Sequence, residues 1–177
     1  MSNKALFRLS LKKRRDAIAH SRREEAKLAL LELIPHLASF RSILSFASFG
    51  SEIDTSLLNL FLADTQRLCL PKVFGNSLKI FHVNQLESQL SHHSFGMLEP
   101  NPEQCTEVEV SKIDVVLVPA LGFDAENHRL GYGKGYYDRL LQYTPSVLTI
   151  GIGFHEQYVP ILPISITDIP LKKVCLF

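Results

Sequence analysis

Six short apolar runs, separated by polar segments, set the strongest limit on the fold of this chain. They lie at residues 43–49, 67–71, 78–83, 114–119, 147–153 and 173–177. Several of these runs are continuous instead of alternating between apolar and polar residues, which is typical of strands buried on both faces. Such burial requires a layer of helices on each side of the sheet. The pattern therefore predicts a three-layer α/β/α fold with a mostly parallel central sheet.

Helix signals lie between the predicted strands. The sequence Ser21-Arg-Arg-Glu24 has the spacing of a capping box, which predicts a helix that begins there and ends near Pro35. Asp54 or Thr55 can cap a second helix. Residues 84–112 show no clear period, so we expect loops and at most one short helix in that segment.

Composition and charge restrict the class of protein. With 177 residues, 46% of them hydrophobic, the chain is expected to form one domain that spans residues 1–177. The net charge is +1, so we expect no nucleic-acid and no membrane partner. The three cysteines lack paired spacing and no apolar stretch is long enough to span a bilayer, which favours a reduced, cytoplasmic protein. We expect a monomer or a weak homodimer.

A glycine-rich run, Gly131-Tyr-Gly-Lys-Gly135, precedes a helix-compatible segment at residues 136–141. Alternating glycines permit positive φ and allow successive backbone N–H groups to converge on an anion at the start of the helix. Arg129 and Lys134 add positive charge to the same loop. The run is neither a Walker A sequence nor Gly-x-Gly-x-x-Gly. It could also serve only as a tight turn, but the two cations favour an anion site.

The residues after the glycine loop have two possible roles. Aromatic residues at the start of a helix, here Tyr136 and Tyr137, are more often packing residues than ligand contacts, and we expect one of them inside and one at the site. Asp138 can stabilise the helix N-terminus through the helix dipole, or it can hold Mg²⁺ near a bound phosphate. Position in the sequence leaves both roles of Asp138 open.

Two segments, Pro119-Ala-Leu-Gly-Phe-Asp124 and Arg129-Leu-Gly-Tyr-Gly-Lys-Gly-Tyr-Tyr-Asp-Arg139, together resemble the signature of the 5-formyltetrahydrofolate cyclo-ligase family, also called methenyltetrahydrofolate synthetases. Further matching segments occur in the family's order at residues 4–8, 51–55, 71–72, 96–100 and 154–157. The resemblance implies an enzyme that converts 5-formyltetrahydrofolate to 5,10-methenyltetrahydrofolate. ATP would be the co-substrate, Mg²⁺ the cofactor, and ADP and phosphate the products. It also implies a fold like that of sugar-phosphate isomerases and CoA transferases.

The resemblance also assigns roles to individual residues. The expected ATP-binding residues are Lys4, Arg8, Arg129, Leu130, Gly131, Tyr132, Gly133, Lys134, Gly135, Tyr136 and Tyr137. Of these, Arg129 and Lys134 are the expected catalytic residues, and Tyr132 occupies a position that varies in the family. The expected substrate-binding residues are Ala47, Glu52 and Tyr136, and the expected metal ligands are Asp138 and Asp168.

Two features of the sequence depart from this simple assignment. The neighbours of Asp168, namely Ser165, Thr167 and Lys172, differ from the family pattern, so Asp168 could instead be a turn residue before Pro170. The basic residues of the N-terminal segment other than Lys4 and Arg8 are expected to lie on a solvated helix face. These residues are Lys12, Lys13, Arg14, Arg15, Arg22 and Arg23.

Two alternative functions remain open on the sequence alone. A sugar-phosphate isomerase of related fold would need a carboxylate base, and Glu99 or Glu156 would have to serve. A non-catalytic nucleotide- or nucleic-acid-binding module would use the basic N-terminal helix. ATP hydrolysis linked to folate turnover would exclude both.

Overall fold

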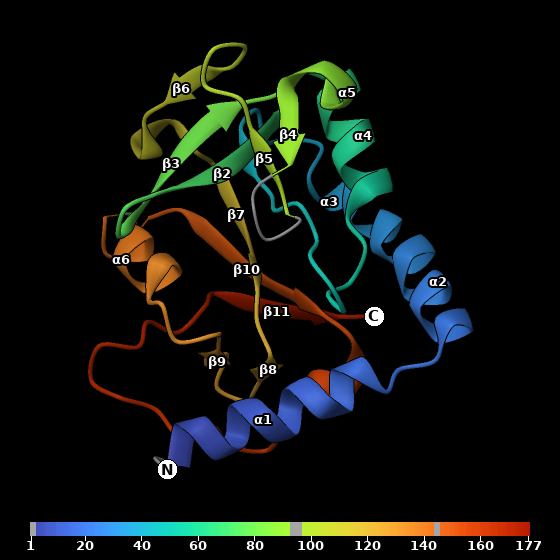
Figure 1. The fold of residues 1–177 in the computed structure, drawn as a ribbon, viewed down its shortest axis with the longest axis vertical. Coiled ribbons are helices and arrows are strands. Elements are labelled where there is room, and N and C mark those ends of the chain that lie inside the picture. Colours follow the sequence, from blue (N-terminus) through green and yellow to red (C-terminus); the bar gives the residue numbers. More distant parts are fainter. Residues whose placement is uncertain (1–2, 93–96, 144–145) are drawn as a thin grey trace.

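The computed structural model describes residues 3–92, 97–143 and 146–177, and its central feature is a seven-stranded sheet within those residues (Figure 1). Its strands are β1 (Ile43–Leu44), β2 (Leu68–Phe74), β3 (Ser77–His82), β6 (Thr106–Val108), β7 (Val115–Pro119), β10 (Leu148–Gly153) and β11 (Lys173–Leu176). Their order is β11-β10-β7-β1-β2-β3-β6. Neighbouring strands from β11 to β2 are parallel, whereas β3 is antiparallel to β2 and to β6. The prediction of a mostly parallel sheet is confirmed.

Helices form the other layers (Figure 1). They are α1 (Asn3–Asp16), α2 (His20–Ala29), η1 (Leu30–Glu32), α3 (Leu33–His36), α4 (Ser56–Asp64), α5 (Leu86–Gln89), η2 (Val110–Lys112), α6 (Tyr136–Gln142) and η3 (His155–Gln157). Helix α1 packs beneath a small hairpin formed by β8 (Gly122–Phe123) and β9 (Arg129–Leu130). In the part of the chain that the structure describes, no helix has the length and apolar character needed to cross a membrane.

Strand β7 shows why the sheet needs helices on both faces. Its four residues from Val115 to Val118 are fully buried. Val115 and Leu117 belong to the apolar cluster formed with α2, α3 and α4, whereas Val116 and Val118 belong to a second cluster with Leu140 of α6. Because successive side chains of a strand point to opposite faces, the continuous apolar run fills two cores at once.

Strand β10 carries glycine where the second core is most crowded. A Cβ atom added at Gly151 would lie 2.5 Å from Cε1 of Phe123 and 2.8 Å from Cδ1 of Leu171. Phe123 is fully buried and cannot move aside freely. We expect Gly151→Ala to lower the free energy of unfolding by about 1–3 kcal/mol in urea titrations. Gly131→Ala is the control for stability, because nothing lies within 4 Å of a Cβ atom there.

The strand predicted at residues 43–49 is wrong in length, because only Ile43 and Leu44 join the sheet. Ser45 still donates its backbone N–H to the carbonyl oxygen of Cys69 in β2 at 2.9 Å, and from Phe46 on the backbone bonds to side chains at the start of α4. The carbonyl oxygen of Phe46 accepts hydrogen bonds from Thr55 Oγ1 at 2.7 Å and from Asn59 Nδ2 at 2.9 Å. Thr55 occupies the predicted N-cap position of α4, but its hydroxyl is used in this contact. The segment after β1 is thereby free to line a cavity.

The capping box predicted at Ser21 is also wrong. Helix α2 begins at His20 with Ala19 as its N-cap, so Ser21 already lies in the first turn. The corner between α1 and α2 is fixed instead by Arg23, whose guanidinium donates hydrogen bonds to the carbonyl oxygens of Ile18 and Arg15. A basic side chain that satisfies the last carbonyls of a helix is a common way to end it. The predicted helix end near Pro35 is confirmed, since α3 ends at His36.

Residues 84–112 contain more structure than the sequence predicts. Besides the short helix α5, the segment forms β4 (Leu90–His92), β5 (Leu98–Pro100) and β6. Strands β4 and β5 pair with each other, and β6 joins the edge of the main sheet. Three-residue strands have no readable periodicity, and these form only because tertiary contacts provide their partners. Gly96, the first residue of the family-matching segment 96–100, is outside the described residues.

Candidate active site

A cavity of about 620 Å³ lies at the carboxyl ends of the central parallel strands. Its walls come from the segment after β1, from β2 and from the end of β7, and they are completed by α1, the glycine loop and the start of α6. In α/β sheets of this kind, ligands bind outside the carboxyl ends of the strands. The cavity brings together all the site residues predicted from the sequence, which are Lys4, Arg8, Ala47, Glu52, residues 129–138 and Asp168.

The glycine loop has the backbone that its sequence predicts. Gly133 and Gly135 have φ of +93° and +68°, a conformation that other residues rarely adopt. Arg8 of α1 donates a hydrogen bond from Nε to the carbonyl oxygen of Gly131 at 2.9 Å. A Cβ atom on Gly133 would lie 3.0 Å from the guanidinium carbon of Arg8. Glycine at position 133 therefore allows the cation and the loop to approach each other.

The two cations of the loop differ in environment. Lys134 is exposed at the cavity, whereas the side chain of Arg129 is only 5% exposed and belongs to β9. Arg129 donates hydrogen bonds to the carbonyl oxygen of Ile169 at 2.6 Å and to Oδ1 of Asp138 at 2.5 Å. Burial lowers the pKa of Arg129 from its ordinary value, and the negative charge of Asp138 opposes that shift. Arg129 is therefore a fixed charge and Lys134 a mobile one.

The two acids predicted to bind metal both interact electrostatically with Arg129. Asp168 accepts a salt bridge from Lys4 and also a hydrogen bond from the backbone N–H of Ser165 at 2.7 Å, so it closes a turn as well as lining the cavity. Burial would raise the pKa of Asp168, but the hydrogen bonds from Lys4 and Ser165 hold it below its ordinary value. Asp168 therefore lines the cavity as a carboxylate.

Asp138 and Asp168 suit a magnesium ion only if phosphate oxygens supply further ligands. Among the described residues, no group of three or more His, Cys, Asp and Glu side chains could hold a metal ion. Magnesium in nucleotide enzymes is commonly held by one or two carboxylates, with phosphate oxygens and water as the remaining ligands. Asp138 and Asp168 are a donor set of that kind.

A second part of the cavity wall is apolar around one carboxylate. Phe46, Ala47 and Phe49 line this part, and Glu52 lines it as well, with its side chain 10% exposed. The backbone N–H of Phe49 donates a hydrogen bond to Oε2 of Glu52 at 3.0 Å. Burial raises the pKa of Glu52, although that hydrogen bond and the charge of Arg15 partly oppose the shift. The pocket can therefore offer a desolvated acceptor to N–H donors of a ligand.

The two tyrosines at the start of α6 both line the cavity, but their environments differ. Tyr137 also packs against the apolar cluster beneath α6, and burial raises its pKa. Tyr136 donates a hydrogen bond to the carbonyl oxygen of Gly75, and its ring lies under the guanidinium of Arg139. Tyr136 is thus the more accessible of the two.

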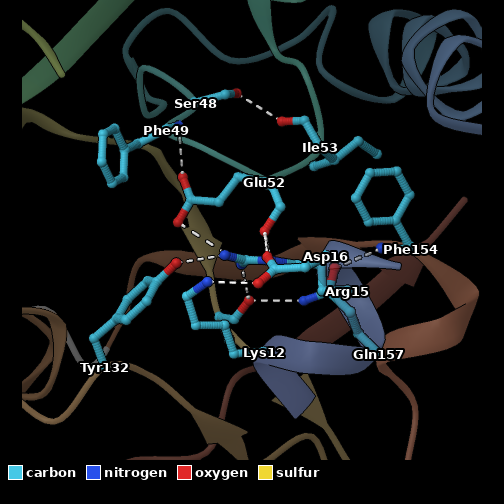
Figure 2. A network of polar contacts seen from close by, with 12 residues as sticks. Lys12, Arg15, Asp16, Ser48, Phe49, Glu52, Ile53, Tyr132, Phe154 and Gln157 are labelled. Atoms are coloured by element: carbon cyan, nitrogen blue, oxygen red, sulfur yellow. Dashed lines mark hydrogen bonds and ion pairs between the residues drawn. The ribbon is translucent and has the colours of Figure 1, made fainter. Parts of the chain in front are cut away.

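Sequence reasoning placed Arg15 on a solvated face, and the structure contradicts this. Arg15 is 2% exposed and contacts both Glu52 and Tyr132 (Figure 2). The signal was present in the spacing: Lys4, Arg8, Leu11 and Arg15 recur at intervals of four, three and four residues, which places them on one helix face. Because Leu11 is buried, that face had to point inward.

Glu99, named from the sequence only as a possible base of an isomerase, is a second buried polar group of the cavity. Glu99 of β5 is 5% exposed and lines the cavity, where its carboxylate accepts from Lys72 Nζ at 3.2 Å and from the backbone N–H of Val73 at 3.3 Å. These bonds fasten the β4–β5 hairpin to β2. Glu156, the other candidate base, pairs with Arg22 at 3.1 Å and belongs to η3.

A cationic glycine loop beside an apolar, acid-containing pocket, on a three-layer α/β/α fold, is an arrangement that suits a polyanion and a second, partly apolar ligand. The model of the 5-formyltetrahydrofolate cyclo-ligase family matches residues 1–176. The chain therefore belongs to that family and is a ligase of folate one-carbon chemistry. Membership of this family does not favour the isomerase or the binding-module alternative.

Individual relatives agree with this assignment. The chain is 31% identical to the 5-formyltetrahydrofolate cyclo-ligase of Escherichia coli K12 over 145 residues, which cover 79% of this chain and 80% of the relative. The mouse enzyme of the same name is 28% identical over 98% of this chain and 93% of its own length. The solved structure of Aquifex aeolicus 5,10-methenyltetrahydrofolate synthetase superposes with a TM-score of 0.84 at 28% identity, covering 98% of this chain and 89% of that one.

Proposed function

We propose that the chain uses ATP to cyclise 5-formyltetrahydrofolate to 5,10-methenyltetrahydrofolate, with release of ADP and phosphate. One observation carries the proposal: a single cavity of about 620 Å³ joins a cluster of fixed and mobile cations to a pocket built around a buried carboxylate. The first end suits the triphosphate of ATP and the second suits the pterin of the folate. The donor and the acceptor of the phosphoryl group can therefore lie in contact.

The reaction needs alignment more than it needs a protein nucleophile. A formamide carbonyl is a poor electrophile, so transfer of the γ-phosphoryl group from ATP to the formyl oxygen creates a leaving group and yields ADP. The second folate nitrogen then attacks the formyl carbon, and phosphate departs as the ring closes. The work of the protein is to position the reactants and to stabilise the charge of the transferring group.

At the nucleotide end, the cations would bind the phosphates. Lys4 and Arg8 lie one turn apart on α1 and face the cavity. Arg129 and Lys134 are the proposed catalytic residues, together with the backbone of the glycine loop. Arg129 is held in place by Asp138 and Ile169, so it can stabilise developing charge without rearrangement. Lys134 is exposed and can follow the phosphoryl group.

At the folate end, Glu52 would accept hydrogen bonds from the N–H groups of the pterin. Ala47 and Tyr136 line the same cavity and would contact the folate. Desolvation strengthens a charge-assisted hydrogen bond, and the raised pKa of Glu52 reflects that desolvation. The carboxylate therefore provides recognition in a pocket that is otherwise apolar.

Asp138 and Asp168 are the proposed ligands for a magnesium ion that arrives with ATP. When bound, magnesium supplies positive charge that neutralises the phosphate oxygens. Each acid is now paired with a cation, Asp138 with Arg129 and Asp168 with Lys4. Lys4 would therefore exchange part of its contact with Asp168 for contact with the phosphates, whereas Arg129 would keep its bond to the carbonyl oxygen of Ile169.

The proposal is tested by mixing purified protein with 5-formyltetrahydrofolate, MgCl₂ and ATP and following the absorbance of the methenyl product. We expect an absorbance rise that requires ATP and stops when EDTA removes the magnesium. Release of ADP should match the methenyl product one to one. A protein that binds ATP and shows no ATP-dependent rise would be a binding module, and the proposal would be wrong.

We also propose that the protein acts in the cytoplasm as a monomer or weak homodimer, without a nucleic-acid or membrane partner. The balanced net charge of +1 supports the absence of polyanionic partners. Light scattering over a range of concentrations would measure the oligomeric state.

A further inference from the structure

Arg15 lies in the last turn of α1 and joins segments that are far apart in the sequence (Figure 2). Its Nε donates to Oγ of Ser51 at 3.0 Å, and its Nη1 donates to the carbonyl oxygen of Ala120 at 3.1 Å. Its Nη2 donates to the hydroxyl of Tyr132 in the glycine loop. Nη1 also lies 3.9 Å from Oε1 of Glu52. The guanidinium therefore contacts one residue from each end of the cavity.

Stability alone does not account for this arginine. A buried cation is costly to desolvate, and the cost is offset well only by a close carboxylate with ideal geometry. The 3.9 Å separation from Glu52 is longer than a hydrogen bond, and the other three partners of Arg15 are neutral. An apolar side chain could fill such a site at no loss of stability. The arrangement therefore favours a role in positioning.

The geometry around Arg15 is fixed on every side. Ser51 donates its hydroxyl proton to Oδ1 of Asp16, which leaves its oxygen to accept from Arg15. Glu52 receives the backbone N–H of Phe49 on Oε2, which leaves Oε1 on the side of Arg15. A guanidinium presents its donors in a rigid plane, so the positions of its partners depend on one another.

We propose that Arg15 is a positioning residue that sets the Glu52 carboxylate at the folate end and Tyr132 at the ATP loop in one fixed arrangement, so that the formyl oxygen meets the transferred phosphoryl group. This inference rests on the proposed function, which assigns the two ends of the cavity to folate and ATP. Arg15 contacts neither reacting group itself. A misplacement of about 1 Å between reactants can lower a rate about 100-fold, which is why such a residue matters.

Arg15 also affects the charge state of Glu52. Among the described residues, the charged or titratable side chains that act on Glu52 are Arg15 from α1 and Tyr137 from α6. Burial raises the pKa of Glu52, and the positive charge of Arg15 opposes the increase. Loss or displacement of that charge allows the pKa of Glu52 to rise further. More of the carboxylate is then protonated at a given acidic pH.

The test compares Arg15→Lys with Arg14→Lys, the same substitution one residue earlier at an exposed position. Both enzymes are assayed with each substrate varied in turn, from pH 5 to pH 8, and their thermal unfolding is recorded. We expect Arg15→Lys to lower kcat/KM for 5-formyltetrahydrofolate about 10- to 100-fold, because lysine cannot reproduce the planar set of donors. We also expect the acidic limb of its pH profile to move to higher pH. Arg14→Lys should match the wild type in both measurements.

Tyr132→Phe provides an independent test. It leaves the buried Arg15 unchanged, so the protein does not have to tolerate a substitution in its interior. Tyr132 is 49% exposed, and the substitution removes only the oxygen that accepts from Arg15. Although Tyr132 lies in the ATP loop, we expect this variant to raise KM for 5-formyltetrahydrofolate about three- to tenfold, because a buried donor of Arg15 is left unsatisfied and the guanidinium shifts. A change in the ATP parameters alone would contradict the inference.

The outcomes separate this inference from the proposed function. Wild-type protein without ATP-dependent methenyl formation would disprove the function itself. If the wild type is active and Arg15→Lys has the same kcat/KM and the same acidic limb of the pH profile, Arg15 only supports the fold. If Arg15→Lys does not fold, the folate KM of Tyr132→Phe decides the question in the same way.

Discussion

Replacing Lys134 with alanine is expected to lower kcat/KM for ATP about 10²- to 10³-fold while thermal unfolding stays unchanged. Lys134 is exposed in the glycine loop, so its loss removes a charge from the cavity without disturbing the core. The interaction that it provides should be strongest where charge develops on the transferring phosphoryl group. Steady-state assays with ATP varied at saturating folate would measure the loss.

Two control variants make the Lys134 result specific. Lys13→Ala removes an exposed lysine of α1 that does not line the cavity, and we expect wild-type kinetics. Lys134→Arg keeps the charge and should recover part of the activity. A fully active Lys134→Ala enzyme, or one that has lost its cooperative unfolding transition, would mean that the glycine run serves as a structural turn. Arg129→Ala is a less clean probe, because Arg129 is buried and holds Asp138 and Ile169 in place.

Replacing Glu52 with glutamine is expected to lower kcat/KM for 5-formyltetrahydrofolate about 10- to 100-fold, since hydrogen bonds to a charged group contribute about 1.5–3 kcal/mol. Glutamine has nearly the same shape and leaves the pocket filled. It replaces the carboxylate by a neutral amide whose NH₂ group can only donate. The parameters for ATP should change much less, which distinguishes this variant from Lys134→Ala.

The same substitution should change how stability depends on pH. The pKa of Glu52 is raised by burial above its ordinary value of 4.5, so the folded protein binds a proton more tightly than the unfolded chain does. The stability that this proton provides is fully present below pH 4.5 and is lost as the pH rises through the folded-state pKa. Glu52→Gln has no such proton. Its free energy of unfolding relative to wild type should therefore increase from pH 4 to pH 7.

Urea titrations at several pH values would measure that difference. The pH dependence is the informative quantity, because changes in packing that involve no charge alter the stability equally at every pH. Glu25→Gln is the control, since Glu25 is an exposed carboxylate of α2. A relative stability of Glu52→Gln that is flat or falls with pH would show that Glu52 is not a desolvated acid.

The sequence determined the features that depend on local chemistry. Continuous apolar runs such as residues 114–119 predicted a sheet covered on both faces, because every side chain of such a strand must be buried. The glycine run predicted positive φ at Gly133 and Gly135 beside two cations. The motifs shared with the cyclo-ligase family brought Lys4 and Glu52 into the same prediction, and both line the cavity.

The tertiary structure alone decided which polar side chains lie inside and how short the strands are. Arg15 and Arg14 are adjacent in a basic segment, yet one is fully buried and the other exposed, because only one of them shares the helix face of Leu11 that packs on the β8–β9 hairpin. Strand β1 is short because, from Phe46 on, the side chains of Thr55 and Asn59 at the start of α4 replace the neighbouring strand as hydrogen-bond partners. Contacts between residues so far apart in the sequence leave no local pattern. The glycine loop does leave one, because its residues are consecutive.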